Sequence, residues 1–294
     1  MESFISMTDI IVAEGFNLDT LAAEMGASTE AKSNSRLPML RTNRRMKDEN
    51  KNRLELGDFY LTGQDKIAYA SSVKFRPLSH HFQYSQYDSI QEKYVNWTRQ
   101  VSNWQEELRD IKGTIRCGRP DSRVMNAMTR EEKAKYKDIK NVRIVRGLVS
   151  FTGKTSDGEE VVYENEPCMV KLTGQNNFAS TDKGIYARFD AQVRDLVPRG
   201  YELWNFELDV TSDEHTSDDG SVFWHTMEWK LDPKSPLKVD QKIYDSIVYL
   251  AEQVRTENNE VDAKYFDAIK EQAGIQGAMD ALGDDLTADF EEVA

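Results

Sequence analysis

Residues 142–155, VRIVRGLVSFTGKT, and residues 159–174, EEVVYENEPCMVKLTG, carry the clearest secondary-structure pattern in the chain. Both stretches are rich in the β-branched and aromatic residues that favour strands. Between them lies Ser156-Asp157-Gly158, and an Asp-Gly pair between two such stretches is a strong hairpin signal. The sequence therefore predicts a long antiparallel hairpin, which makes strands the main element of the fold.

Further strands are expected on both sides of this hairpin. Residues 54–63 and 67–78 have strand composition, and residues 80–101 predict a second hairpin with its tip at DSIQEK, residues 88–93. A last hairpin is expected from YELWNFELDV and SVFWHTMEWKLD, with Asp219-Gly220 at its turn. In YELWNFELDV, apolar and polar residues alternate from Trp204 to Val210, which is typical of a half-buried strand.

Helices are predicted in three places. Tyr186, Phe189, Val193 and Val197 recur at helical spacing before Pro198, so a helix is expected between the two hairpins. Residues 105–140 are polar and partly helical, because Thr129 with Glu132 three residues later forms a capping-box pattern. Two short helices are expected within residues 236–273.

The order strand, strand, strand, helix, strand, strand from about Ile67 to Leu231 is that of an OB-fold. We therefore expect a mainly β protein with α elaborations (α+β), built as an OB-like small β-barrel with extended hairpins, C-terminal helices and a disordered acidic tail. Small β-barrels with other strand orders are the alternative. The expected organisation is a short N-terminal segment and linker (1–35), a basic arm (36–53), an OB-like core (54–235) with an insertion at about 105–140, C-terminal helices (236–273) and the tail (274–294).

Composition limits the class of protein. The chain has 294 residues, a net charge of −13 and two cysteines, Cys117 and Cys168, so neither a disulfide framework nor a zinc-site spacing is expected. No stretch reaches the roughly 18 to 20 apolar residues of a membrane span, and the N-terminal stretch lacks the basic residues of a signal peptide. The expectation is a soluble protein of a reducing cytoplasm, with no membrane contact.

The negative charge is concentrated at one end. Residues 252–294 hold twelve acidic and three basic residues, whereas residues 32–53 hold eight basic and two acidic residues. Such asymmetry points to nucleic-acid contact or to an interaction tail.

Signals for catalysis are weak. TGKT at 152–155 lacks the first glycine of a phosphate-binding loop, because Leu148 stands at its position. The four histidines show no helical metal pair. Cys117 has basic neighbours that could lower its pKa, but no histidine lies near it in the sequence. We therefore expect no enzymatic activity, no cofactor and no metal site.

Signals for binding are stronger. Single-stranded nucleic acid is held by basic residues that follow its phosphates and by aromatic rings on which its bases stack. Residues 74–104 interleave these two types; the alternative for any one ring is a place in the core. The candidate DNA-binding residues are Arg36, Arg41, Arg44, Arg45, Lys74, Arg76, Phe82, Tyr84, Tyr87, Tyr94, Trp97, Arg99, Arg116, Arg119 and Arg123.

The segments RLPMLRTNRR, FRPLSHHFQYSQYDSIQEKYVN and CGRP, together with the acidic tail, resemble the single-stranded-DNA-binding proteins of bacteriophages. The resemblance implies an OB-fold and a role in DNA replication and recombination, in the host cytoplasm if a phage encodes the protein. The acidic tail is expected to compete with DNA for the basic groove and, once displaced, to recruit replication proteins; a merely solubilising disordered end is the alternative. The tail residues concerned are Asp284, Asp285, Asp289, Phe290, Glu291 and Glu292. Phe290 is followed by four further residues, unlike the terminal or near-terminal phenylalanine of the best-known tails.

The sequence thus predicts a sequence-independent single-stranded-DNA-binding protein that uses a basic groove and aromatic stacking. Two alternatives stand beside it. One is a β-rich phage structural or assembly protein, in which the aromatic residues form core and interface. The other is an acidic protein that binds a host polymerase or nuclease.

Overall fold

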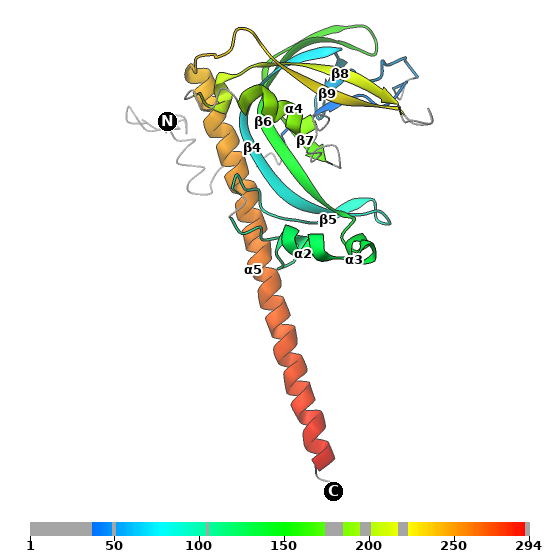
Figure 1. The fold of residues 1–294 in the computed structure, drawn as a ribbon, viewed down its shortest axis with the longest axis vertical. Coiled ribbons are helices and arrows are strands. Elements are labelled where there is room, and N and C mark those ends of the chain that lie inside the picture. Colours follow the sequence, from blue (N-terminus) through cyan, green and yellow to red (C-terminus); the bar gives the residue numbers. More distant parts are fainter. Residues whose placement is uncertain are drawn as a thin grey trace, which may run out of the picture. The chain divides into compact units, whose positions relative to one another are not determined.

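The computed structural model describes residues 37–48, 51–103, 106–173, 185–194, 201–216 and 223–291. In this part of the chain the fold is mainly β with helical additions, and its strands pair antiparallel. The α+β class expected from the sequence is confirmed. Figure 1 shows the long curved strands β4 and β6 at the centre of the described fold.

The chain order of the elements follows the predicted pattern. The strands are β1 (Leu40–Thr42), β2 (Phe59–Leu61), β3 (Ala68–Tyr69), β4 (Ser72–Asp88), β5 (Lys93–Trp97), β6 (Ile139–Thr155), β7 (Glu160–Thr173), β8 (Leu208–Thr216) and β9 (Phe223–Leu231). The helices are η1 (Arg116–Gly118), α2 (Ser122–Ala127), α3 (Arg130–Ala134), α4 (Ile185–Arg194), η4 (Leu203–Asn205) and α5 (Gln241–Glu291). Helix α4 lies between β7 and β8 in the chain, as expected.

The main sheet is organised by β4 and β6, which are 17 residues each. β6 pairs with β4 on one side and with β7 on the other, and β4 also pairs with β8 near its start and with β5 near its end. The predicted hairpin between β6 and β7 is confirmed, with Gly158 at φ +87° in its turn. The predicted tip at residues 88–93 is confirmed between β4 and β5. Among the described residues no ladder joins β7 to β9, so the sheet is not closed into a barrel.

A bulge in β4 explains why β6 has a glycine at position 147. The register between these strands shifts between Pro77 and Ser79, where proline cannot donate a ladder hydrogen bond. Gly147 is the partner of Pro77, and a Cβ atom at Gly147 would lie 2.2 Å from the carbonyl oxygen of Arg76. Only glycine permits so close an approach of the two strands.

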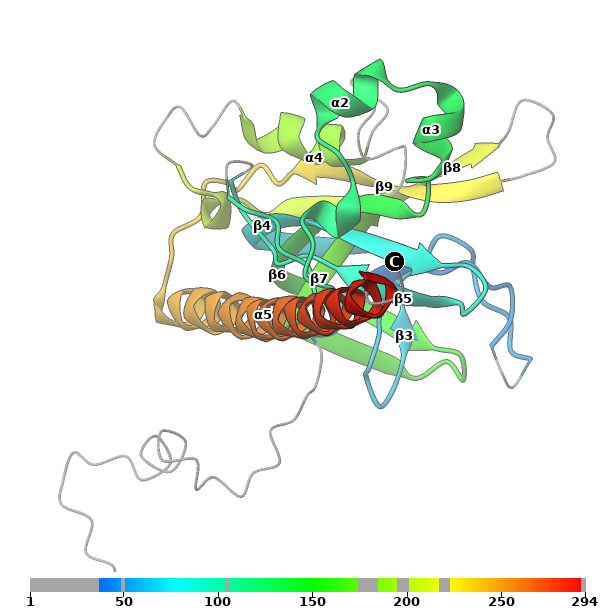
Figure 2. The same ribbon diagram turned by 90° about the horizontal axis from the view of Figure 1, so that it is seen from below.

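The two faces of β6 enter two different hydrophobic clusters, because successive side chains of a strand point to opposite sides. Val145 and Val149 belong to a cluster with residues of β2, β4, β7, β8, β9 and α4. Ile144 and Leu148 belong to a second cluster that includes Ile243 and Leu250 of α5. Figure 2 shows α5 on one side of the sheet and α2, α3 and α4 on the other.

Polar contacts hold α5 along the sheet. The side chain of Arg146 in β6 is fully buried and forms an ion pair with Glu257 of α5, with 2.9 Å between nitrogen and oxygen. Asn258 accepts a hydrogen bond from the backbone of Gln100 at 2.7 Å and donates one to its carbonyl at 2.8 Å. Because these contacts lie midway along the helix, they support one continuous helix; the prediction of two short helices was wrong.

The acidic end of the chain also differs from expectation. The backbone of α5 remains helical to Glu291, so the disordered tail predicted from residue 274 was wrong up to that point. Glycine and like charge lower helix stability, but no proline interrupts the stretch, and alanine and leucine favour its continuation.

Other expectations were met in part. Residues 37–48 are extended as expected, but they are packed: Leu40 is buried and β1 pairs with β2. The stretch at 201–210 begins with the turn η4, and β8 starts only at Leu208. The helix expected from Tyr186 to Val197 is α4, with Phe189 buried. Asp219-Gly220 and Arg36 lie outside the described residues.

Candidate nucleic-acid interface

The β4–β5 hairpin carries an exposed pair of aromatic rings. Tyr87 and Tyr94 are register partners, and their ring centres lie 5.3 Å apart in an edge-to-face arrangement. Tyr87 is 37% exposed and Tyr94 is 53% exposed. A shift in register between Gln86 and Tyr87 sets this pair off from the regular ladder. Exposed rings on a strand pair are the kind of surface on which nucleic-acid bases stack.

A third ring on the same strand is paired with a cation. The guanidinium carbon of Arg119 lies 5.9 Å from the centre of the half-buried Tyr84 ring. The same guanidinium donates a hydrogen bond to the carbonyl of Ile139 at 2.9 Å. Arg119 therefore ties the loop after η1 to both β4 and the first residue of β6.

A buried carboxylate shapes the loop that precedes Arg119. Asp110 is 0% exposed and accepts hydrogen bonds from the backbone of Lys112 (3.0 Å), Thr114 (3.1 Å) and Cys117 (2.9 Å), and from the Thr114 hydroxyl (2.5 Å). Arg116 and Cys117 both have φ of 57°, a conformation that is unfavourable for residues with a side chain. The hydrogen bonds to Asp110 offset the cost of this backbone conformation. They also fix the conformation of the loop that leads to Arg119.

Cys117 is a structural residue in this loop. Burial, with a smaller contribution from the charge of Asp110, raises the pKa of its thiol to about 12. The idea that basic neighbours activate this cysteine was wrong, because its side chain is buried beside a carboxylate. The thiol therefore stays protonated near neutral pH, whereas the thiolate is the nucleophilic form of cysteine.

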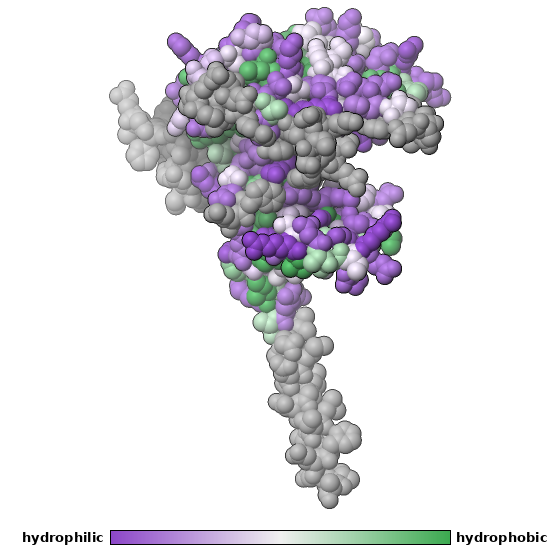
Figure 3. Space-filling view, viewed as in Figure 1, coloured by the Kyte–Doolittle hydropathy of each residue, from purple (hydrophilic) through white to green (hydrophobic). Residues whose placement is uncertain are grey.

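The segment from Thr114 to Lys140 is basic. It holds eight basic and four acidic residues in a chain whose net charge is −13. η1 lies against β4 and β5, Asp121 caps α2, and Thr129 with Glu132 forms the predicted capping box of α3. We call residues 114–140 the basic lobe. β5, α2 and α3 lie together at one end of the long strands (Figure 1), and hydrophilic residues dominate this part of the surface, with a few apolar ones between them (Figure 3).

Five of the predicted residues lie on the β4–β5 hairpin or in the loop that η1 places against it: Tyr84, Tyr87, Tyr94, Arg116 and Arg119. Arg123, four residues after Arg119 in the chain, is exposed on α2. The sequence analysis missed Asp110, which holds the loop, and the lysines of residues 133–140. The charge count of that segment was the signal that could have indicated them.

Three predicted residues make internal contacts instead. The ammonium group of Lys74 forms ion pairs with Asp209 at 2.9 Å and with Asp232, and hydrogen bonds to these two carboxylates raise its pKa. Arg76 is buried and donates hydrogen bonds to the carbonyls of Trp204 and Lys238, each at 2.8 Å. Phe82 is 1% exposed and belongs to the core. Successive side chains of a strand point to opposite faces, so the aromatic and basic residues of β4 include both surface and core side chains.

Trp97 and Arg99 lie under α5. The Lys264 ammonium is 5.7 Å from the Trp97 ring centre, and Arg99 lies 3.7 Å from the carboxylate of Asp262. Both residues are half-buried. They contact the helix rather than presenting a free surface.

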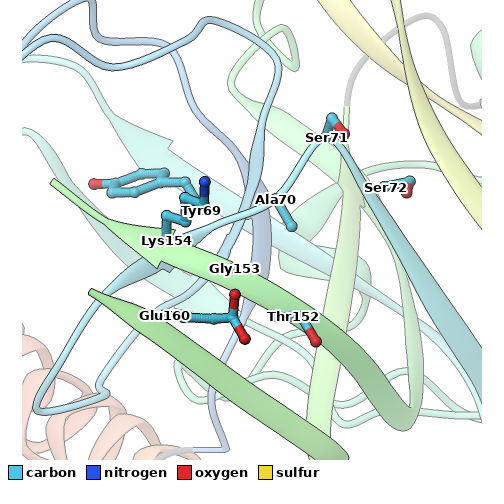
Figure 4. Close-up of a pocket in the computed structure, with 8 residues that line it drawn as sticks. All are labelled: Tyr69, Ala70, Ser71, Ser72, Thr152, Gly153, Lys154 and Glu160. Carbon is cyan, nitrogen blue, oxygen red and sulfur yellow. The ribbon is translucent and has the colours of Figure 1, made fainter. Parts of the chain in front are cut away.

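The predicted arm lies at another place. Arg41, Arg44 and Arg45 are all exposed, and Arg41 is the register partner of Tyr60 in β2. Nearby, a cavity of about 240 Å³ is lined by Tyr69, Thr152, Lys154 and Glu160, among others. Figure 4 shows Tyr69 and Lys154 side by side at this cavity. Tyr60 and Tyr69 were not predicted as site residues.

The acidic tail residues are described only in part. Asp284, Asp285, Asp289, Phe290 and Glu291 lie in the helical backbone of α5, while Glu292 lies outside the described residues.

One group of side chains has the composition of a metal site. Ligand atoms of Asp213, His215 and Glu228 lie within 4.8 Å of one another. The protein itself already occupies them: His215 forms a hydrogen bond with Thr226 at 2.7 Å, and Glu228 forms an ion pair with Arg188. No metal is assigned to this group.

No protein-family model, curated protein or solved structure that was compared with the chain matches it. Within the described part of the chain, no helix combines the length and the apolar character needed to cross a membrane. Function is therefore inferred from the residues and their geometry.

Proposed function

We propose that this protein binds single-stranded DNA without sequence preference, through the basic lobe and the three tyrosines beside it. The observation that carries the proposal is the exposed Tyr87–Tyr94 pair, which lies on the same hairpin as the Arg119–Tyr84 contact. Rings supply stacking, worth about 1–3 kcal/mol per base, and the lobe supplies cations for the phosphates.

The strand order supports an OB-like interpretation. β4, β6 and β7, then α4, then β8 and β9 follow the order of that fold, which is a five-stranded, partly open barrel. In that interpretation the connection between β4 and β6 corresponds to the loop between the first and second strands, one of the two loops by which OB-folds contact oligonucleotides. The basic lobe lies within this connection.

Local charge decides how binding would occur. The net charge of −13 opposes long-range attraction of a polyanion. The positive charge of the lobe acts only within about one Debye length, roughly 10 Å at 0.1 M salt. We therefore expect contacts to be made by the lobe itself, with strong salt dependence, and without rapid electrostatic steering.

The acidic C-terminal residues are assigned the role implied by the phage resemblance: competition with DNA and recruitment of replication proteins. The backbone of α5 is helical up to Glu291, so in this proposal the acidic residues up to that point lie on a helix. We propose no enzymatic activity.

A second candidate function is protein–protein assembly. Tyr244, Val248 and Tyr249, which are close together on α5, are 56%, 50% and 44% exposed, and a contiguous group of exposed apolar residues favours an interface. Sedimentation of the protein with and without DNA separates the two functions, because assembly of this kind needs no nucleic acid.

The direct test of DNA binding is fluorescence anisotropy with labelled oligo-dT. Tyr94→Ala should weaken binding, whereas Tyr244→Ala, which removes an exposed ring outside the basic lobe, should leave it unchanged. Equal affinities of both variants and the wild type would reject the proposed surface.

A further inference from the structure

Two tyrosines that the proposed interface does not use form a second aromatic surface. The ring centres of Tyr60 and Tyr69 lie 5.6 Å apart at an angle of 44°. Their chain neighbours Phe59, Ala68 and Ala70 are buried, so strand alternation turns both rings away from the core. Both tyrosines are half-buried, which leaves part of each ring open to a ligand.

Cations flank this pair on both sides. Arg41 is the register partner of Tyr60, and Lys154 is the register partner of Tyr69. Register partners share a face of the sheet, and both cations are exposed. Together Arg41, Tyr60, Tyr69 and Lys154 form a row of cation, ring, ring and cation, which we call the tyrosine platform.

The platform borders two hollows. Tyr69 lines both the cavity of about 240 Å³ shown in Figure 4 and a neighbouring one of about 500 Å³ that Arg45 also lines. A volume of about 500 Å³ lies in the range of small-molecule sites, roughly 300–1,000 Å³. A nucleobase fits such a space beside a ring, with its phosphate directed to Arg45 or Lys154.

Part of the acidic lining is engaged by the protein. Asp48 and Asp157 both accept hydrogen bonds from the Asn52 side chain, at 3.0 and 3.2 Å. Glu159 forms an ion pair with Lys66 at 2.7 Å. The ion pair offsets the charge of Glu159, whereas Asp48, Asp65 and Asp157 in the lining of the larger hollow keep their charge. A bound phosphate is therefore directed toward Arg45 or Lys154 and away from these carboxylates.

A comparison with Tyr163 separates the platform from ordinary core tyrosines. Tyr163 is buried, stacks on Phe151 and donates a hydrogen bond to the carbonyl of Lys66 at 2.6 Å. Burial and this bond give Tyr163 a structural role. Tyr60 and Tyr69 are more exposed, and their rings lie against each other.

The platform and the basic lobe lie at opposite ends of β6. Tyr84 is opposite Asn141, and Tyr69 is opposite Lys154. Thirteen residue steps along a strand correspond to about 40 Å at roughly 3.3 Å each; the curvature of the strands (Figure 1) makes the direct path shorter. One extended nucleic-acid strand can reach both ends.

We propose that the tyrosine platform is a second stacking site for the bases of the same single-stranded DNA that the basic lobe binds. The proposal rests on the proposed function, and it adds a prediction about length. Short oligonucleotides occupy one end only, whereas longer ones bind both ends and gain affinity.

The test is a series of oligo-dT lengths, from five to thirty nucleotides, measured with the wild type and with Tyr60→Ser/Tyr69→Ser. The wild type should gain affinity as length increases past the span of one site. The variant should keep the affinity for short oligonucleotides and lose about tenfold or more for long ones. Tyr69→Phe keeps the ring and should retain binding, and Tyr244→Ser is the control at an exposed tyrosine elsewhere. Melting curves of all variants check that a loss of affinity does not come from unfolding.

A second readout locates the strand. Oligo-dT with one 5-iodouracil near either end should crosslink to Tyr60 or Tyr69 from one end and to the basic lobe from the other. If the double variant binds long oligonucleotides as tightly as the wild type does, and no crosslink reaches the platform, the inference is wrong while DNA binding stands. If the wild type binds no oligonucleotide, the proposed function itself is wrong.

Discussion

The guanidinium carbon of Arg119 lies 5.9 Å from the centre of the Tyr84 ring, and the same group donates a hydrogen bond to the carbonyl of Ile139 at 2.9 Å. One side chain thus joins the basic lobe to β4 and β6. Its charge is also available to a phosphate that approaches the ring. If the proposed function holds, substitution of Arg119 should therefore affect both the stability of the fold and the affinity for DNA.

Arg119→Met should reduce both stability and DNA affinity. The lost hydrogen bond and the lost cation–π contact are each worth roughly 1 kcal/mol. If Arg119 contacts one phosphate, the slope of log K against log salt should become less steep by about 0.7. Urea unfolding and oligo-dT titrations at several salt concentrations measure the two effects. An unchanged slope would show that this arginine is only structural.

Tyr94 and Phe82 provide a matched comparison of surface and core. Tyr94→Ala, at a ring that is 53% exposed, should weaken binding by about 1–3 kcal/mol with little change in melting temperature. Phe82→Ala, at a ring that is 1% exposed, should lower the free energy of unfolding by about 3–5 kcal/mol. Calorimetry and anisotropy on both variants check this. A clearly lower melting temperature for Tyr94→Ala than for the wild type would show that the Tyr94 ring belongs to the core.

The ion pair between Arg146 and Glu257 should stabilise the docking of α5. Glu257→Ala leaves a fully buried guanidinium without its carboxylate and should cost about 3 kcal/mol, the lower end of the range for broken buried pairs. Adding Arg146→Met removes the isolated charge and should recover part of that loss. Urea unfolding of the two single variants and the double variant measures the coupling. Strictly additive losses would contradict the role given to this pair.

Acid should destabilise the fold before its carboxylates titrate. Burial, with smaller contributions from Arg143 at His80 and from Arg146 at His81, lowers the pKa values of both histidines to about 4. Unfolded histidine has a pKa near 6.5, so between about pH 6.5 and 4 the unfolded chain binds more protons than the folded one. Stability is therefore fully present above about pH 7 and should fall by roughly 1.4 kcal/mol per pH unit for each histidine below it.

The pH dependence is checked by urea unfolding at intervals from pH 7.5 to pH 4.5. His81→Gln should halve the slope in that window, because one of the two titrating groups is gone. If the stability of His81→Gln depends on pH as steeply as that of the wild type, the pH dependence comes from other groups in the protein.

The strands were predictable because their signals are local. The Asp157-Gly158 turn, the hairpin tip at residues 88–93 and the capping box at Thr129 each depend on a few neighbouring residues, and all three are confirmed. Pairing of β4 with both β6 and β8 joins residues up to 139 positions apart, as between Ser72 and Thr211. No local pattern contains that information.

The residue types of the candidate site could be predicted from the sequence, but which positions of the strands are exposed could not. Aromatic and basic residues alternate along β4 and β5, so Tyr87 and Phe82 look alike in the sequence, although one is exposed and the other is core. Lys74 and Arg76 were misplaced for a related reason. Their partners Asp232 and Lys238 lie more than 150 residues further along the chain, and only the fold brings them together.

The length of α5 was also beyond local reasoning. Gln100 and Arg146 contact Glu257 and Asn258, and these contacts support the middle of a helix whose own sequence is rich in asparagine and glutamate at that point.

The central claim is that the basic lobe and its tyrosines bind single-stranded DNA. The most direct test is a titration of the wild-type protein with labelled oligo-dT at 50 mM and 300 mM salt, with duplex DNA as competitor. Binding that weakens with salt at a slope of about −0.7 for each phosphate contacted, together with little competition from duplex, is the predicted result. No binding at 50 mM salt, or affinity that is equal at both salt concentrations, would contradict the account.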